Sequence, residues 1–441
     1  MHKILIANRG EIAVRIIRAC HEICLRTVAV YSTVDRDALH VKMADQAVCI
    51  GPANPQASYL NQTNIIEAAR QTGADAIHPG YGFLSENAEF AKLCETQGIT
   101  FIGPHSETIA LLGDKARARE VMQNADVSVI PGSAEGFTEL GTALYQANEI
   151  GYPVMLKAAA GGGGKGMRLI HSEAQLKHEF TMAQGEAQKA FGNPEMYLEK
   201  FIVRPRHIEV QILADSFGNA VSLGERDCSL QRYHQKVMEE APSAIDHKTR
   251  YEMLSTARRA AKALNFLGAG TIEFLYAGPS QFYFMEMNTR IQVEHPITEF
   301  ITGVDLVRGQ LRIAAGMALG ISQEKVTLNG YALECRITAT VPGTIKGLHL
   351  PGGNGVRVDT ALYQGYQVPA NYDALLAKII TYAPTREIAV KKMQVAIDET
   401  VIEGVGTNLD FLYRLLNNQD VLDNKFDIEF IDRLIKEDAH D

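Results

Sequence analysis

The sequence predicts a multidomain protein that combines an α/β region with α+β regions. Residues 1–113 alternate short apolar runs with amphipathic segments, which is the pattern of a parallel sheet covered by helices. Residues 114–327 contain longer runs with period-two alternation, typical of antiparallel strands, and residues 328–441 mix strands with helices. A chain of 441 residues, 46% hydrophobic and 22% charged, can bury more than one core.

The N-terminal region is expected to form a parallel, Rossmann-like sheet. Between the first two predicted strands, apolar residues recur at helical spacing from Ile12 to Cys24. The first turn after a strand reads Asn8-Arg9-Gly10-Glu11 and lacks the glycine fingerprint of dinucleotide-binding proteins, which argues against an NAD oxidoreductase. The predicted strands are Ile4–Ala7, Thr27–Tyr31, Ala47–Ile50, Asp75–His78 and Thr100–Gly103.

The middle region predicts a sheet with one polar face. In the run from residue 207 to 212, His207, Glu209 and Gln211 alternate with three aliphatic residues. We expect the polar face to line a cleft and the aliphatic face to pack on a core. In the last region, strands are expected near Ala332–Ile337 and Leu376–Tyr382, and helices near Arg386–Glu399 and Asn408–Leu416.

Charge and cysteine content narrow the functional classes. With 52 acidic and 43 basic residues the net charge is -9, and no run of lysine or arginine indicates nucleic-acid binding. The six cysteines show neither a C-x-x-C pair nor zinc spacing, so we expect free, buried thiols in a reducing compartment. The N-terminus has no signal-peptide pattern, and no apolar stretch has the length of a membrane span. A cytoplasmic protein without membrane association is therefore expected.

A glycine-rich loop is the first candidate site. Gly161–Gly166 directly follows the predicted strand Pro153–Ala159, which carries Lys157. Successive glycines let main-chain N–H groups approach phosphate oxygens, and Lys165 adds positive charge. The run does not match the P-loop motif. Because lysines and strands flank it closely, we expect a loop that covers phosphates in preference to a flexible linker.

Two carboxylates and an amide form the second candidate site. Glu273 on one predicted strand and Glu286 and Asn288 on the next are separated by the loop Ala277–Ser280. If this loop is a four-residue hairpin turn, Glu273 faces Phe284 and lies diagonal to Glu286. Roughly 7 to 8 Å between such diagonal positions suits hard cations such as Mg²⁺. The alternative is a pair of solvent-facing glutamates, but large apolar side chains on the same face favour a cleft.

The third candidate site follows immediately in the run from Asn288 to Pro296. Arg290, Gln292 and Glu294 alternate along it. Arginine offers a fork for a small planar anion, and a neighbouring glutamate can accept a proton from that anion. Each residue alone would more often belong to a surface salt bridge. Their clustering beside the metal face predicts a site for an oxyanion substrate.

Taken together, these motifs resemble those of one family. The runs ANRGEIA, HPGYGFLSEN, FIGP, GDK, GGGGKGM, ERDCSLQRYHQK, EEAP and EMNTRIQVEHPITE resemble biotin carboxylase, an ATP-grasp ligase, over essentially the whole chain. Other ATP-grasp enzymes share the glycine loop and the glutamates, but not RIQVEH beside QRYHQK. The resemblance implies a Rossmann-like domain at 1–113, an ATP-grasp domain at 114–327 with a mobile lid at about 131–203, and a C-terminal α+β domain at 328–441.

The resemblance also implies a nucleotide site. Its phosphate contacts would be Lys115, Lys157, Gly162, Gly163, Gly164 and Gly166. The adenine site would be formed by Glu199, Lys200 and Ile202, with Leu275 beneath the base. The ribose and phosphate contacts would be His207, Gln231 and His234.

The metal, bicarbonate and biotin sites are implied in the same way. Glu273, Glu286 and Asn288 match ligands of two Mg²⁺ ions, for which Mn²⁺ can substitute. The bicarbonate site would be formed by Lys236, Arg290, Gln292 and Val293. Glu294 matches the general base, Arg336 the arginine that stabilises the biotin enolate, and Tyr81 a position in the biotin pocket.

The implied reaction carboxylates biotin at the expense of ATP. Glu294 deprotonates bicarbonate, which attacks the γ-phosphate of ATP and forms carboxyphosphate. This intermediate breaks to carbon dioxide and phosphate, the phosphate removes the N1 proton of biotin, and Arg336 holds the resulting enolate. Electrostatic stabilisation by metals and cations would be the main contribution of the protein, and lid closure would exclude water.

Several other functions compete with this interpretation. The chain could serve acetyl-CoA carboxylase, or be the biotin carboxylase domain of a pyruvate or other acyl-CoA carboxylase. Another ATP-grasp ligase, of the carbamoyl-phosphate or peptide type, would share the phosphate loop and the metals but not need biotin. A non-catalytic nucleotide-binding regulator would be expected to lack Glu286, Glu294 or Arg336, and all three are present.

Partners are expected because the chain has no Ala-Met-Lys-Met carrier motif. Biotin should therefore arrive on a biotin carboxyl carrier protein, and a carboxyltransferase should complete the reaction. The resemblance further implies a homodimer, and we expect a free subunit of acetyl-CoA carboxylase in preference to an excised domain.

One segment departs from the family pattern. After Arg336 the family usually continues with Asp-Pro and a Phe-x-Pro-Ser-Pro-Gly stretch, whereas Thr338–Gly343 here is several residues shorter. Either the loop is shortened or a segment is missing from the sequence. The position of Arg336 is the same in both cases.

Overall fold

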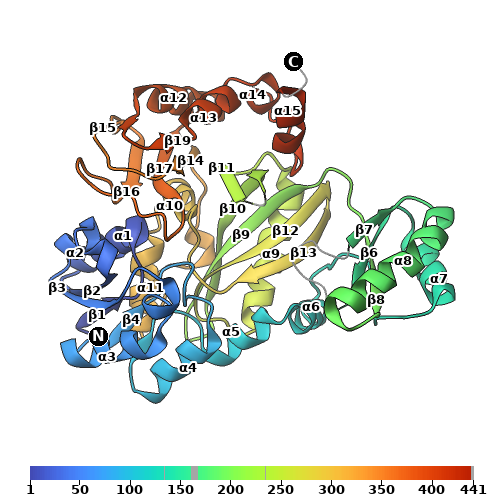
Figure 1. The fold of residues 1–441 in the computed structure, drawn as a ribbon, viewed down its shortest axis with the longest axis horizontal. Coiled ribbons are helices and arrows are strands. Elements are labelled where there is room, and N and C mark those ends of the chain that lie inside the picture. Colours follow the sequence, from blue (N-terminus) through green and yellow to red (C-terminus); the bar gives the residue numbers. More distant parts are fainter. Residues whose placement is uncertain (134, 160–166, 234, 439–441) are drawn as a thin grey trace.

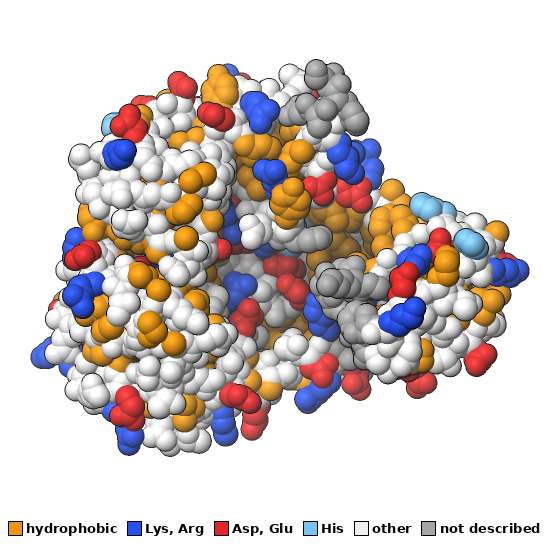
Figure 2. Space-filling model, in the orientation of Figure 1, with side chains coloured by type: hydrophobic (Ala, Val, Ile, Leu, Met, Phe, Trp, Pro, Cys, Tyr) orange, Lys and Arg blue, Asp and Glu red, His pale blue; other side chains and the backbone are white. Residues whose placement is uncertain are grey.

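The structure is a computed structural model that describes residues 1–133, 135–159, 167–233 and 235–438. An N-terminal α/β part, a long central sheet and a C-terminal α+β part lie around a cleft, and a smaller unit projects to one side (Figure 1). The predicted combination of α/β and α+β parts is confirmed. In the space-filling view, acidic and basic side chains gather in the hollow between these parts (Figure 2).

The N-terminal part is a parallel sheet with strand order β3-β2-β1-β4-β5. Each predicted strand is present, with small shifts at the ends, and the first predicted helix follows β1. Gly10 begins that helix with a φ of 69°, a left-handed conformation that glycine adopts without a Cβ penalty. The elements are β1 Lys3–Ile6, α1 Gly10–Glu22, β2 Arg26–Ser32, α2 Leu39–Met43, β3 Gln46–Gly51, α3 Gln62–Thr72, β4 Ala76–His78, α4 Ala88–Thr96, β5 Thr100–Phe101 and α5 Ser106–Gly113.

The projecting unit is a small sheet of order β7-β6-β8, covered by α7 and α8. Its core contains Leu156, Phe180 and Leu198, all fully or almost fully buried. The unit lies within the segment predicted as a lid. Its elements are α7 Leu140–Ile150, β6 Val154–Ala158, β7 Met167–Ile170, α8 Glu173–Phe191 and β8 Met196–Lys200, and α6 Lys115–Asn124 precedes the unit in the chain.

The central and C-terminal parts share one sheet. Its strand order is β13-β12-β9-β10-β11-β14-β17-β16, with antiparallel neighbours throughout. The pairing of β11 with β14 crosses the predicted domain boundary at residues 327 and 328. The central elements are β9 Arg206–Ala214, β10 Ala220–Arg232, β11 Gln235–Ala241, α9 His247–Ala263, β12 Gly268–Gly278, β13 Gln281–Asn288, α10 His295–Thr302 and α11 Leu306–Ala314.

The C-terminal part completes this sheet and covers one end of it with helices (Figure 1). Both predicted strands and both predicted helices are present. The elements are β14 Tyr331–Val341, β15 Gly347–His349, β16 Val356–Thr360, β17 Leu375–Ala383, α12 Arg386–Glu399, β18 Val401–Glu403, β19 Gly406–Thr407, α13 Leu409–Leu416, α14 Gln419–Leu422 and α15 Phe430–Asp438.

The alternation in β9 separates a core face from a polar face, as predicted. Ile208, Val210 and Ile212 are fully buried in a hydrophobic cluster with α9 and β12. On the opposite face, Glu209 and Gln211 are also fully buried, so this face is a polar interior and not an open surface. Buried polar groups require partners, and the site below supplies them.

The hairpin of β12 and β13 differs from its predicted register. Gln281 pairs with Gly278 and not with Tyr276, so the turn is shorter than the expected loop. Register shifts along the two strands then place Glu273 directly opposite Glu286. The predicted diagonal arrangement is therefore wrong, because β-bulges change the register and the alternation of residue types does not reveal them. The two carboxylates still share one face, as predicted.

The segment after Arg336 continues the strand that carries this residue. β14 continues to Val341, which pairs with Gly406 on β19. Thr338 N–H donates to Asn408 Oδ1 at 2.8 Å, and Asn408 Nδ2 donates to the Arg336 carbonyl at 2.9 Å. Asn408 therefore fixes the backbone of β14 directly after Arg336.

All the cysteines are free thiols, as expected, but Cys24 and Cys49 are exposed and only the other four are buried. Among the described residues, no helix combines the length and the apolar character needed to cross a bilayer.

Candidate active site

The cleft contains a cavity of about 620 Å³ with walls from the N-terminal, central and C-terminal parts. The strands β9 to β14 present polar side chains to it on the face opposite their core. Every residue predicted for the metal, bicarbonate and biotin sites lines this cavity, together with two of the nucleotide contacts. These residues are Tyr81, His207, Gln231, Lys236, Glu273, Glu286, Asn288, Arg290, Gln292, Val293, Glu294 and Arg336.

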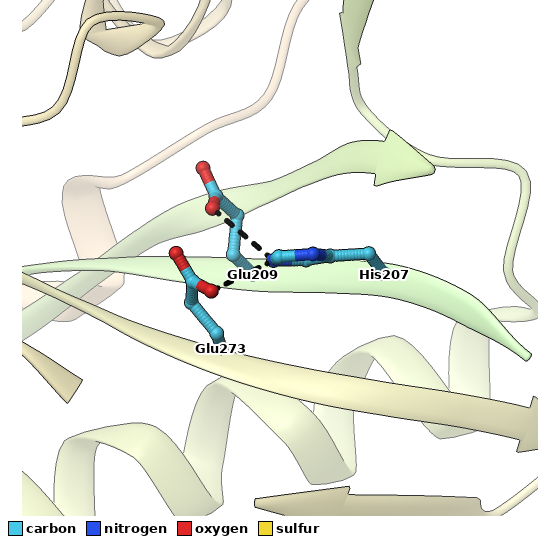
Figure 3. A group of neighbouring side chains, drawn as sticks. All are labelled: His207, Glu209 and Glu273. Carbon is cyan, nitrogen blue, oxygen red and sulfur yellow. Dashed lines mark ion pairs between the residues drawn. The ribbon is translucent and has the colours of Figure 1, made fainter. Parts of the chain in front are cut away.

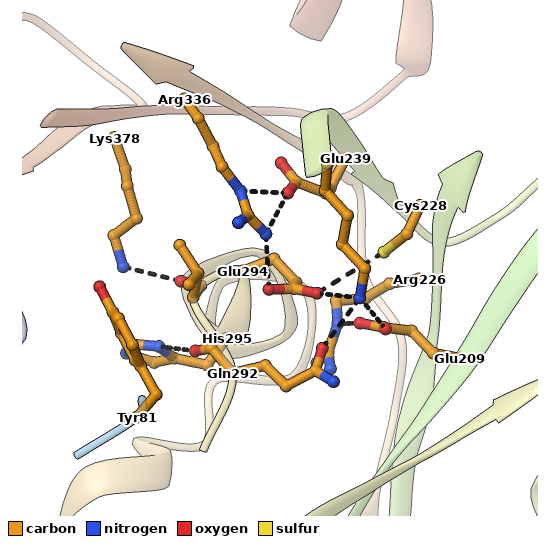
Figure 4. A network of polar contacts seen from close by, with 12 residues as sticks. Tyr81, Glu209, Arg226, Cys228, Glu239, Gln292, Glu294, His295, Arg336 and Lys378 are labelled. Atoms are coloured by element: carbon orange, nitrogen blue, oxygen red, sulfur yellow. Dashed lines mark hydrogen bonds and ion pairs between the residues drawn. The ribbon is translucent and has the colours of Figure 1, made fainter. Parts of the chain in front are cut away.

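Two cations, Lys236 and Arg336, contact the carboxylate of Glu294, and Figure 4 shows the contact with Arg336. Lys236 Nζ donates to Glu294 Oε1 at 2.6 Å, and Arg336 Nη2 donates to Oε2 at 2.9 Å. Burial alone would raise the pKa of Glu294, but Lys236 and then Arg336 outweigh burial and hold this pKa well below its usual range. Glu294 is therefore ionised, and it becomes a stronger proton acceptor when the contact with one of these cations weakens.

Glu273 contacts both Lys236 and His207, and Figure 3 shows it beside His207. His207 Nε2 lies 3.0 Å from Glu273 and 3.7 Å from Glu209. Lys236 Nζ contacts the same two carboxylates at 3.2 and 2.7 Å. Burial would raise the pKa of Glu273, but Lys236 and then His207 hold it well below its usual range. Lys236 and His207 both contact Glu209 and Glu273, so these four residues form a hydrogen-bonded floor of the cavity.

Glu286 differs from Glu273 because its side chain is exposed to the cavity. Burial and then the charge of Glu273 raise the pKa of Glu286. Asn288 Nδ2 donates to Glu273 Oε1 at 2.8 Å, and the amide oxygen of Asn288 accepts a hydrogen bond from Arg290 Nη2 at 3.0 Å. A divalent cation would relieve the repulsion between the carboxylates, and Mg²⁺ prefers such oxygen ligands. The residues present therefore fit the predicted metal.

The turn between β13 and α10 is held by several anchors. Arg290 Nε donates to Glu86 Oε2 at 2.8 Å, and Gln292 Nε2 donates to Glu273 Oε1 at 2.9 Å. Burial lowers the pKa of His295 well below its usual range, so its ring is neutral and Nδ1–H donates to the Gln292 carbonyl at 2.8 Å. The side chains of this turn therefore have fixed positions at the cavity wall.

Arg336 is also paired with Glu239 on the adjacent strand β11. Arg336 Nε donates to Glu239 Oε1 at 2.6 Å. Burial raises the pKa of Glu239 to about 7, although Arg336 opposes this shift. One guanidinium thus serves two buried carboxyl groups, Glu239 and Glu294, which keeps it at the cavity wall.

The other residues predicted for the nucleotide lie in or near the projecting unit. Lys157 forms an ion pair with Glu199, which Arg119 Nη1 also contacts at 3.0 Å, and Lys200 Nζ donates to the Gly151 carbonyl at 2.8 Å. The cavity lining does not include the described residues Lys115, Lys157, Glu199, Lys200, Ile202 and Leu275. The predicted contacts Gly162, Gly163, Gly164, Gly166 and His234 lie outside the described residues.

Sequence reasoning missed several charged residues that support the site. Arg226 is fully buried and donates to Glu209 Oε1 at 2.5 Å, beneath the predicted bicarbonate residues. Glu239 on β11 contacts Arg336 at the cavity wall, and Lys378 on β17 contacts Val293 there. The one available signal was a charged residue inside an otherwise apolar strand, as for Lys378. The partner of such a residue depends on pairing between distant strands.

Family models cover most of the chain. The model of the biotin carboxylase N-terminal domain matches residues 1–109, and that of the biotin carboxylase C-terminal domain matches residues 334–433. Between them, the ATP-binding domain of the carbamoyl-phosphate synthase L chain matches residues 114–322. This middle domain is shared among ATP-grasp ligases, and the flanking domains distinguish between them.

Individual relatives agree with these matches. "Biotin carboxylase 1" of Bacillus subtilis is 52% identical over 98% of both chains, and "Biotin carboxylase" of a Nostoc species is 54% identical over 98% of this chain and 99% of its own. The biotin carboxylase domain dimer of Hydrogenobacter thermophilus 2-oxoglutarate carboxylase, solved with MgADP, ADP and bicarbonate, is 49% identical. It superposes with a TM-score of 0.88 over 98% of this chain and 97% of that chain.

Fold and site together define an enzyme of the ATP-grasp ligase class. The chain belongs to the biotin carboxylase family.

Proposed function

We propose that this enzyme carboxylates biotin on a carrier protein, using ATP and bicarbonate and passing through carboxyphosphate. The observation that carries the proposal is a single cavity that joins an oxygen-rich metal face to a buried glutamate and an arginine. Phosphoryl transfer needs the metal face, and removal of a proton from bicarbonate needs the glutamate. The arginine is needed to stabilise the enolate of biotin.

Glu294 is proposed as the base that deprotonates bicarbonate. It is ionised, and Lys236 and Arg290 at the same cavity wall supply positive charge for the anion. Bicarbonate that shares Lys236 would weaken the contact of 2.6 Å between Lys236 and Glu294, and the basicity of Glu294 would rise. The deprotonated substrate then attacks the γ-phosphate of ATP, ADP leaves, and carboxyphosphate forms.

Glu273, Glu286 and Asn288 are proposed to hold Mg²⁺, or Mn²⁺ in its place, because all three line the cavity and Glu273 lies opposite Glu286 on the neighbouring strand. Such an ion neutralises charge on the phosphate oxygens of the nucleotide when it is bound. Lys157, Glu199 and Lys200, three of the remaining predicted nucleotide residues, lie on strands of the projecting unit, which we propose to be the lid. The domain limits at residues 113 and 327 and the mobility of the lid stay predictions.

The second half of the reaction is assigned to Arg336 and Tyr81. Carboxyphosphate breaks to carbon dioxide and phosphate, and the phosphate takes the N1 proton of biotin. The guanidinium of Arg336 would then face the enolate oxygen, and the enolate attacks the carbon dioxide through N1. Arg336 is held at the cavity wall by Glu239 and Glu294, so it needs little reorganisation when this charge appears.

The proposed partners are those that would bring biotin to this chain, because its sequence has no Ala-Met-Lys-Met carrier motif. We propose a biotin carboxyl carrier protein and a carboxyltransferase as partners, a homodimer as the assembly, and acetyl-CoA carboxylase as the whole enzyme. The relative from 2-oxoglutarate carboxylase is itself a dimer, and it keeps a pyruvate or another carboxylase open as the alternative. A cytoplasmic location stays a prediction.

The deciding experiment is an assay of ADP formation with and without bicarbonate and free biotin. Turnover should require Mg²⁺, bicarbonate and biotin together, because the metal face adjoins the bicarbonate residues. Undiminished turnover without bicarbonate and biotin would show a different ATP-grasp ligase.

A further inference from the structure

A buried lysine lies directly behind the cavity wall. Lys378 is fully buried in β17, between the aliphatic residues Ala377 and Ile379. It pairs in register with Arg336 on β14 and with Asp359 on β16. Residues directly opposite each other on neighbouring strands point to the same face, so all three side chains lie on the side of the cavity. Lys378 itself does not belong to the described residues that line the cavity.

The ammonium group of Lys378 contacts two separate parts of that wall. Nζ donates to the carbonyl oxygen of Val293 at 2.7 Å and forms an ion pair with Glu11 Oε1 at 3.1 Å. Glu11 in turn accepts a hydrogen bond from the hydroxyl of Tyr81. In Figure 4, Lys378 reaches down to the turn that precedes α10, next to Tyr81. Val293, Glu11 and Tyr81 all line the cavity.

The Val293 carbonyl oxygen accepts the hydrogen bond from Lys378 at a position just before helix α10. The first hydrogen bond of α10 runs from Ile297 N–H to the Glu294 carbonyl at 3.3 Å, so the Val293 carbonyl lies before the helix ladder. Val293 is flanked by Gln292 and Glu294, whose side chains contact Lys236. Its peptide group therefore sets the direction of both neighbouring side chains.

The charge of Lys378 is not explained by packing alone. Removing an ammonium group from water is unfavourable, and a buried ion pair often stabilises a fold no better than apolar side chains of the same volume. A methionine would fill this volume beside Ala377 and Ile379. What it could not do is donate to Val293 or neutralise Glu11.

We propose that Lys378 is a positioning residue for both substrates. Through the Val293 carbonyl it orients the turn that carries the bicarbonate residues, and through Glu11 it orients Tyr81 in the biotin pocket. The inference rests on the proposed function, since bicarbonate and biotin are the substrates assigned to that cavity. Lys378 acts through these neighbours and touches neither substrate.

The test compares the parent with Lys378→Met, Glu11→Gln, the double variant Lys378→Met/Glu11→Gln and the control Thr381→Val. Thr381 is a buried residue of the same strand that bonds the Ala389 carbonyl at 3.0 Å, away from the cavity. For each protein, kcat and the KM values for bicarbonate, biotin and ATP are measured. Hydrogen exchange of residues 290–295 is measured in parallel, because it reports the order of the turn independently of activity.

Lys378→Met should lower kcat/KM for bicarbonate by about tenfold to a hundredfold, the effect of losing one hydrogen bond from a charged donor. The KM for biotin should also rise, the KM for ATP should change by less than about twofold, and residues 290–295 should exchange faster. The double variant should recover much of the biotin KM, because a neutral glutamine in place of Glu11 removes the carboxylate that Lys378 neutralises beside Tyr81, but it should not recover the bicarbonate kinetics. Thr381→Val should keep the parental kinetics for all three substrates, and Glu11→Gln should raise the KM for biotin more than it lowers kcat/KM for bicarbonate.

The proposal is overturned if Lys378→Met keeps parental kinetics for bicarbonate, or if the double variant regains them. It is also overturned if Thr381→Val loses as much as Lys378→Met. Should Lys378→Met fail to fold, the charge-balanced double variant provides the same bicarbonate test. A parent without bicarbonate-dependent turnover would instead contradict the proposed function. The positioning role of Lys378 would then be tested by hydrogen exchange alone. If residues 290–295 exchanged at the same rate in Lys378→Met as in the parent, the positioning role would be refuted.

Discussion

Replacement of Glu294 by glutamine separates the charge of the proposed base from its shape. The carboxylate is 2% exposed and accepts hydrogen bonds from Lys236 at 2.6 Å and Arg336 at 2.9 Å. Each hydrogen bond to a charged group contributes about 1.5–3 kcal/mol, and glutamine retains one neutral acceptor, so we expect Glu294→Gln to lower the free energy of unfolding by about 3 kcal/mol. Loss of a general base should lower ATP cleavage and carboxybiotin formation together by roughly 10²- to 10⁴-fold.

The pH dependence of this stability loss has a defined sign. Because the folded pKa of Glu294 lies well below its ordinary value of 4.5, its contribution is present above pH 4.5 and is lost as the pH falls through the folded pKa. The difference between parent and Glu294→Gln in the free energy of unfolding should therefore be constant from about pH 6 to 8 and shrink in acid. Denaturant titrations across this range measure it.

A matched control is Glu225→Gln. Glu225 is a fully buried carboxyl group paired with Arg250 at 2.7 Å, outside the cavity lining. This variant should lose stability but keep its turnover per folded molecule. Parental coupled activity in Glu294→Gln would refute the assignment of the base. A stability difference that is the same in acid and at neutral pH would refute the electrostatic reasoning.

Three further outcomes are expected. Arg336→Met should retain bicarbonate-dependent ATP cleavage while carboxybiotin formation falls by roughly 10²-fold, because the guanidinium is needed only when the enolate appears. Parallel measurement of phosphate and carboxybiotin tests this, and equal losses of both would contradict it. Glu239 has a folded pKa of about 7, so its stabilising contribution is present below pH 4.5 and is lost as the pH rises through 7. Glu239→Gln should therefore gain stability relative to the parent as the pH rises from about 4.5 to 7 in denaturant titrations, and a constant difference would argue against the raised pKa. Chelation should abolish ATP turnover and added Mg²⁺ restore it, with Glu286→Gln requiring about tenfold more Mg²⁺. An unchanged Mg²⁺ titration would remove Glu286 from the metal site.

Local patterns predicted the individual elements well. The alternation in the run from His207 to Ile212 is a property of consecutive residues, and it correctly separated the core face of β9 from its polar face. The register of the hairpin that carries Glu273 and Glu286 was predicted wrongly. A β-bulge changes which residues lie opposite each other on two paired strands, but it leaves the alternation of residue types unchanged. The bulges therefore become apparent only from the strand pairing in the structure.

The supporting contacts of the site were beyond local reasoning. Glu239 and Arg336 are 97 residues apart in the chain, and they meet because β11 pairs with β14. Lys378 was visible in the sequence as a lysine inside an apolar strand. Its role at Val293 became apparent only when β17 was placed beside β14.

By itself, the sequence determined the kinds of elements, the α/β and α+β classes, and the residue types whose chemistry suits phosphate, metal and bicarbonate. These depend on the identity of residues close together in the chain and on motifs read as a set. The tertiary structure alone decided that these residues surround one cavity, that Glu294 lies between two cations, and which buried charges hold its walls. The physical reason is that a pKa, an ion pair or a buried hydrogen bond depends on distances between groups, and strand pairing between remote segments sets those distances.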